Sequence, residues 1–540
     1  MLLPRSIEIL LKSLPQSLEA PGARSAHQKV ANRVISEPDL AVEIVGYIAQ
    51  SVRHDDQVKR VMGLLSAVLD EVRMAHENGK ALGTAFLRFL DEELAQRNRD
   101  GTLSSEGRLY LASCWVRAGL ESPEALVADP SMFEHIEDAF TEMDVAEMGP
   151  HIDKLLRTVS GSAEQDLLAL QAGLFELFAL FPAPVRRFLV REIVAHPKSV
   201  TAALGCALLL DRRREVQQGA IEGLKVRQAQ GALAGDTIGR LTMMRSWLVE
   251  PDTLRGVDEI VQHAIRNGTV GGGAVSTLKV HRVLTSLVDG TGSQSMVVVF
   301  QFGGARKVAV LLIKQGFGIK DAYLVPCSSA SEQRRLVEMI ASEMETCEVP
   351  LEYISTAISL GLSDGLANNQ PPAPGLIDIV WALGFQDMRP RSASTTDVVA
   401  LVDPEGQLNT MSAQAKGRLI AASADWGTSF SMIAESWFED SDMIRDAIES
   451  NVSQTALKRA LWQALESRRE HWSMAIARMG YLLQVMGRSE ALQFAAVAQA
   501  LSEGRALKKT PIMELIFDMS VSVWVHENMR FMTESGGSHR

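Results

Sequence analysis

Cysteine and aromatic residues are scarce in this chain of 540 residues. It has four cysteines, and Phe, Trp and Tyr together make up 6% of it. The thiols at 114, 206, 327 and 347 are too few for a disulfide framework and too scattered for a zinc knuckle. We therefore expect all four cysteines to be reduced, with no two placed for a disulfide.

Positive charge is also in short supply. The chain carries 54 Lys and Arg against 66 Asp and Glu, a formal net charge of −12. This balance predicts no general attraction to nucleic acid or to an anionic membrane. The hydrophobic share of 46% and the charged share of 22% are typical of globular proteins and argue against a disordered chain.

Long hydrophobic runs are absent. The most apolar helix candidate, Leu167–Phe181, contains Gln171 and Glu176 and falls short of the ~20 apolar residues that a bilayer span needs. Charged residues interrupt the apolar start of the chain, so no secretory signal is recognised. We expect a cytoplasmic protein that does not enter a membrane.

What the sequence does contain is a succession of helix patterns. Apolar residues recur at i, i+3, i+4 and i+7 over 58–72, and helical stretches follow over 82–94 and 109–116. Gly119 is typical of a helix end, and Ser122-Pro123-Glu124 is typical of a helix start. The sequence predicts a helical array over 1–267.

Such helical hairpins bury their apolar faces by bundling or by stacking as a solenoid. In residues 196–224, Asp211 is followed by Val216, Ala220 and Leu224. This segment resembles the turn and second helix of a HEAT-type repeat, although it lacks the usual proline and has Gln217 where arginine is frequent. The resemblance implies an irregular HEAT-like α-solenoid, and a non-repeat helical domain is the alternative.

The HEAT resemblance sets specific expectations. Asp211 should lie in the turn between two helices and accept backbone amides of the second one. Val216, Ala220 and Leu224 should be buried, and Ala220 should be small because the helices approach closely there. The helices next to this hairpin in space should be its neighbours in sequence and should form a curved right-handed array.

Beyond residue 268 the pattern changes to short strands. Runs rich in apolar and β-branched residues are separated by glycine turns and lie at 280–288, 296–302, 307–313 and 322–325. Ser329 to Glu332 then forms a capping box that begins a helix. The sequence predicts an inserted antiparallel β-meander plus helix over 280–346. One sheet face should be covered by its own helix and the other by the solenoid.

The C-terminal region, 350–540, returns to helix patterns. Residues 368–375 are expected to form a stiff proline-rich connector, and Asp397–Val402 is a candidate for one more strand. The predicted fold class is therefore mainly α: an irregular HEAT-like α-solenoid or helical array with a small inserted antiparallel β-meander plus helix.

No local motif indicates catalysis. The sequence contains no His-Glu-x-x-His, paired Cys-x-x-Cys or Gly-x-Ser-x-Gly pattern. The glycine-containing segment Asp289–Ser293 lies between two strands and indicates a hairpin turn rather than a phosphate loop. Cys327, between a strand and a helix, has the most reactive setting, yet a structural thiol is the favoured interpretation. We expect no catalytic residue, cofactor or metal site.

Two groups of basic residues remain as candidates for partner binding. One is the rim of the β-unit: Arg306, Lys307, Lys314 and Lys320. The other is the turn Arg212-Arg213-Arg214 in the proposed repeat. The leading hypothesis is a non-catalytic scaffold that binds a protein partner through these surfaces. A nucleic-acid-associated solenoid is a less favoured alternative, and an enzyme whose site is assembled from distant residues is the third.

Overall fold

The structure is a computed structural model that describes most of the chain. The described residues are 3–15, 23–52, 55–128, 145–160, 167–268, 277–342, 344–385, 387–392, 394–440, 442 and 453–535. The chain divides into two compact units. Unit 1 consists of Met1–Leu204 and Gln218–Gly223, and unit 2 consists of Gly205–Gln217 and Leu224–Arg540.

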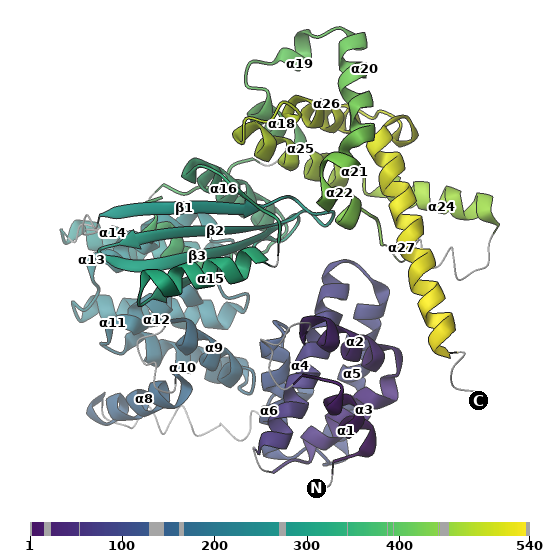
Figure 1. Cartoon of the computed structure of the whole chain (residues 1–540). Helices are drawn as coiled ribbons and strands as arrows, with labels where there is room; N and C mark the ends of the chain where they lie inside the picture. Colours follow the sequence, from purple (N-terminus) through teal and green to yellow (C-terminus); the bar gives the residue numbers. More distant parts are fainter. Residues whose placement is uncertain are drawn as a thin grey trace. The chain divides into compact units, whose positions relative to one another are not determined.

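Helices are the regular elements of unit 1 over its described residues (Figure 1). They are α1 (Arg5–Lys12), α2 (Ala23–Ser36), α3 (Pro38–Ala49), α4 (Asp56–Glu77), α5 (Ala81–Arg99), α6 (Ser105–Arg117), η1 (Glu124–Leu126), α8 (Val145–Ser160), α9 (Leu167–Phe178) and α10 (Ala183–Ala195). Two further helices, α11 (Ser199–Leu208) and α12 (Arg214–Ala229), contribute residues to both units.

The core of unit 1 is built around α4, which packs against α2, α5 and α6. The apolar stripe predicted over 58–72 is buried, and Asp55 caps the helix by accepting a hydrogen bond from the backbone N of Val58 at 2.9 Å. Gly119 adopts a positive φ of 72° at the end of α6, as predicted. The helix start expected at Ser122 gives only the single turn η1.

Two glycines bring α12 against α10 within unit 1. A Cβ atom at Gly219 would lie 2.4 Å from the carbonyl oxygen of Arg187, and one at Gly223 would lie 2.6 Å from that of Arg191. Because a step of four residues along α12 matches a step of four along α10, the two helices run parallel at this contact. The sequence predicted a close approach at Ala220 between the two helices of the hairpin, whereas the close approach found here joins α12 to α10 at Gly219 and Gly223.

Unit 2 combines helices with one sheet. Its helices after α12 are α13 (Gly235–Met244), η3 (Arg245–Trp247), α14 (Pro251–Arg266), α15 (Ala330–Ser342), α16 (Leu351–Ala367), α17 (Leu376–Ala382), α18 (Thr395–Val402), α19 (Gln407–Thr410), α20 (Ala413–Ala421), η4 (Ala422–Asp425), α21 (Trp426–Ser429), α22 (Ser431–Ser436), α24 (Gln454–Ser467), α25 (Arg469–Val485), α26 (Ala491–Ser502), η5 (Leu507–Lys509) and α27 (Pro511–Ser535).

The predicted hairpin at 196–224 has the expected burial. Asp211 lies between α11 and α12, and Val216, Ala220 and Leu224 are fully buried. Within unit 2, α12 also packs beside α14: Gln217 accepts a hydrogen bond from Thr253 at 2.6 Å. Three further polar contacts join α12 to α14, and residues later in α12 contact residues later in α14. These two helices therefore also run parallel. The curvature and handedness of the array stay predictions.

The sheet has five antiparallel strands in the order β4-β3-β2-β1-β5. They are β1 (Leu278–Ser286), β2 (Ser293–Phe302), β3 (Ala305–Lys314), β4 (Gly318–Cys327) and β5 (Thr346–Glu348). The predicted meander plus helix is therefore present as an insertion between helical regions. The sequence did not indicate β5, which is three residues long and pairs with the end of β1.

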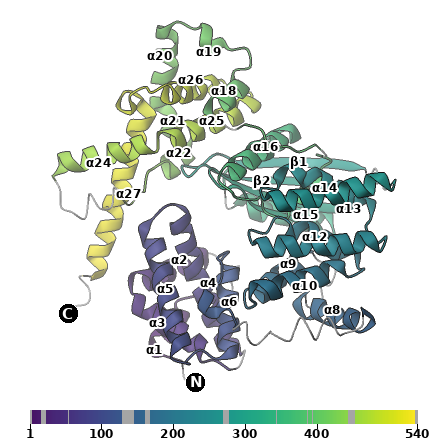
Figure 2. The same cartoon turned by 180° about the vertical axis from the view of Figure 1, so that it is seen from behind.

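Both faces of the sheet are covered, as expected. On one face Val297, Val299, Val308 and Val310 form a core with Val337 of α15. The other face, which includes the fully buried Phe300, is on the side where α16 packs (Figures 1 and 2), and α17 packs against β4 as well. The predicted cover by the N-terminal array is thus replaced by these two helices, and α13 packs on the outside of α17.

The C-terminal helices surround a core of aromatic side chains. Trp426 stacks on Phe494 with ring centroids 3.5 Å apart, and Trp437 lies 5.9 Å from Trp472. The strand considered at 397–402 is wrong, because this segment is α18, which begins with a capping box at Ser394. All four cysteines are free, as predicted.

Candidate functional site

The arginine turn between α11 and α12 is largely engaged in internal contacts. Asp211 accepts hydrogen bonds from the backbone N of Arg213 at 2.8 Å and from its guanidinium. Arg214 pairs with Asp252, and this contact lowers the pKa of that carboxyl. Arg212 is exposed. The turn therefore offers one uncommitted arginine rather than three.

The four basic residues of the β-unit do not form one rim. Arg306 and Lys307 begin β3, whereas Lys314 ends it and Lys320 lies at the start of β4. Arg306 and Lys314 are eight residue steps apart along the strand, which corresponds to about 26 Å. The structure brings Lys314 close to Lys320, since both ammonium groups lie near the ring of Phe317, at 4.8 and 5.9 Å from its centroid.

The turn between β3 and β4 is held by a partly buried ion pair. Asp364 of α16 accepts hydrogen bonds from the backbone N of Gly316 at 2.9 Å and from Arg478 of α25 at 3.0 Å. The side chains of Asp364 and Arg478 are 16% and 11% exposed. Charges so enclosed interact more strongly than surface pairs, so this contact fixes the turn against α25.

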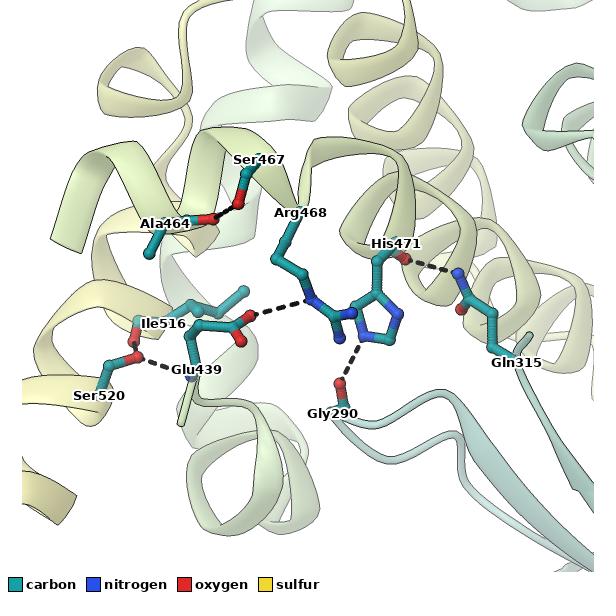
Figure 3. A network of polar contacts seen from close by, with 9 residues as sticks. All are labelled: Gly290, Gln315, Glu439, Ala464, Ser467, Arg468, His471, Ile516 and Ser520. Carbon is teal, nitrogen blue, oxygen red and sulfur yellow. Dashed lines mark hydrogen bonds and ion pairs between the residues drawn. The ribbon is translucent and has the colours of Figure 1, made fainter. Parts of the chain in front are cut away.

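His471 joins the two sheet turns to the start of α25 (Figure 3). Its Nε2 donates a hydrogen bond to the carbonyl oxygen of Gly290, in the β1–β2 turn, at 2.8 Å. The backbone oxygen of His471 accepts a hydrogen bond from Gln315, in the β3–β4 turn, at 3.3 Å. A Cβ atom at Gly290 would lie 2.1 Å from the carbonyl oxygen of Ser436, so a larger residue would not fit there.

We call this group the sheet–helix junction and define it by Gly290, Gln315, Arg468 and His471. The pKa of His471 is lowered from 6.5 to about 4, first by burial and then by the positive charges of Arg468, Arg478 and Lys314, while the Gly290 hydrogen bond acts in the opposite direction. The imidazole is thus neutral at pH 7. Because its Nε2 faces a carbonyl, Nε2 carries the proton.

A second layer supports Arg468. Its Nε lies 3.4 Å from Oε2 of the buried Glu439. Burial raises the pKa of this carboxyl overall, and Arg468 offsets part of that rise. The backbone N of Glu439 donates a hydrogen bond to Ser520 of α27 at 2.7 Å (Figure 3). These contacts connect the loop after α22, α25 and α27, so their effect is structural.

The titratable groups of the junction contact backbone and carboxylate groups of the same unit: His471 contacts Gly290 and Arg468 contacts Glu439. Within the described ranges, no three His, Cys, Asp or Glu side chains are placed to hold a metal ion. The thiol of Cys327 has a pKa raised by burial and by Glu332, which supports a structural thiol. Sequence reasoning missed His471 and its contacts because they join positions up to 181 residues apart and follow no local motif.

Comparisons with known proteins match three separate parts of the chain. Residues 4–123 match the family model described as uncharacterised protein y4lR N-terminal domain, residues 182–268 the y4lR second domain, and residues 396–525 the y4lR C-terminal helical domain. The uncharacterized protein y4lR of Sinorhizobium fredii is 26% identical over 480 residues, covering 87% of this chain and 89% of that protein. No solved structure matches.

The three matched ranges leave the sheet and α15–α17 between them. None of the three is a HEAT-repeat model, so the HEAT resemblance stays a prediction. Over the part of the chain that the structure describes, no helix is long and apolar enough to cross a bilayer.

Proposed function

We propose that this chain is a non-catalytic interaction protein: a HEAT-like helical array that binds a protein partner through its helical surface and the loops of the β-unit. The observation that supports the proposal best is the parallel packing of α12 beside α10 and beside α14. Polar contacts between these helices join residues 32 to 38 positions apart in sequence. This offset lies within the range of solenoid repeats, whose extended surfaces serve partner binding.

The state of the polar groups agrees with this proposal. The ion pair of Asp364 with Arg478 and the hydrogen bond of His471 to Gly290 hold elements of unit 2 together. In the arginine turn, Arg213 and Arg214 are paired with aspartates. This pairing weakens the alternative that the turn binds the phosphate backbone of a nucleic acid. The four free thiols suit a reducing compartment, so we place this activity in the cytoplasm.

Native isolation of the full chain tests the proposal. A tagged chain, expressed at its natural level and purified at about 0.15 M salt, should co-elute with a protein at a fixed molar ratio after nuclease treatment. Arg212→Glu, on the exposed turn, should lower that ratio, whereas Arg418→Glu on the exposed side of α20 should not. Elution of the chain alone, or with nucleic acid that nuclease removes, would contradict the proposal.

A further inference from the structure

We draw no further inference here: the strongest candidate, the surface patch where Lys508 of η5 lies over the ring of Trp462 of α24, carries nothing, because that ring is already stacked on Phe517 of α27 and nothing in the structure shows what covers the patch.

Discussion

Acid should weaken unit 2 through His471, because the folded protein binds a proton there far less readily than the unfolded chain does. The pKa of this imidazole is about 4 in the fold and 6.5 when unperturbed. Because the pKa of His471 is lower in the folded state, the free energy of unfolding has its full value above pH 6.5. The stabilisation is lost as pH falls toward 4, since the unfolded chain takes up the proton first.

The size of the effect follows from the two pKa values. One pKa unit corresponds to about 1.4 kcal/mol, so the whole shift is worth at most about 3 kcal/mol. Between pH 7 and pH 5 the loss is about 2 kcal/mol. Protonation also places a positive charge among Arg468, Arg478 and Lys314, while the hydrogen bond to Gly290 is kept. The junction should therefore loosen through charge repulsion rather than through loss of that bond.

Urea unfolding followed by tryptophan fluorescence at several pH values measures this effect. His471→Gln keeps an amide donor for Gly290 and cannot titrate, so its stability should change about 2 kcal/mol less between pH 7 and pH 5. The exposed His281, changed to Gln, is the control and should follow the wild type. Histidine-selective NMR titration reads the pKa directly. If His471 titrates near 6.5, or the pH dependence of His471→Gln equals that of the wild type, the reasoning is refuted.

Three further changes are expected to alter stability, each measured by thermal or urea unfolding. Gly223→Ala should cost about 1–3 kcal/mol, because its Cβ would lie 2.6 Å from the carbonyl oxygen of Arg191 in α10. The control Gly63→Ala has open space around its Cβ and should be neutral or stabilising. Equal effects of the two substitutions would contradict the close approach. Asp364→Asn should cost about 1–3 kcal/mol by leaving the partly buried Arg478 without its counter-ion, and adding Arg478→Met should restore part of that loss. Asp211→Ala should cost about 1 kcal/mol through the lost turn contacts; an unchanged midpoint would contradict its role.

Local patterns determined most of the secondary structure because each depends on residues close together in sequence. The spacing of apolar residues over 58–72 predicted α4, and alternation with glycine turns predicted the first four strands. Where two local signals competed, the weaker one misled: the β-branched residues of 397–402 favoured a strand, whereas the capping box at Ser394 and Asp397 makes a helix. The three residues of β5 carry too short a pattern to be recognised.

The sequence alone also determined the reduced cysteines, the lack of a membrane-spanning pattern and the burial of Val216, Ala220 and Leu224. Only the tertiary structure decided which elements cover the sheet and which basic residues share a row, because β3 separates Arg306 from Lys314 by its length and the strand register aligns Arg306 with Gln301 and Lys279. Long-range contacts such as His471 with Gly290 depend on how two distant segments pack, and no spacing along the chain encodes that distance.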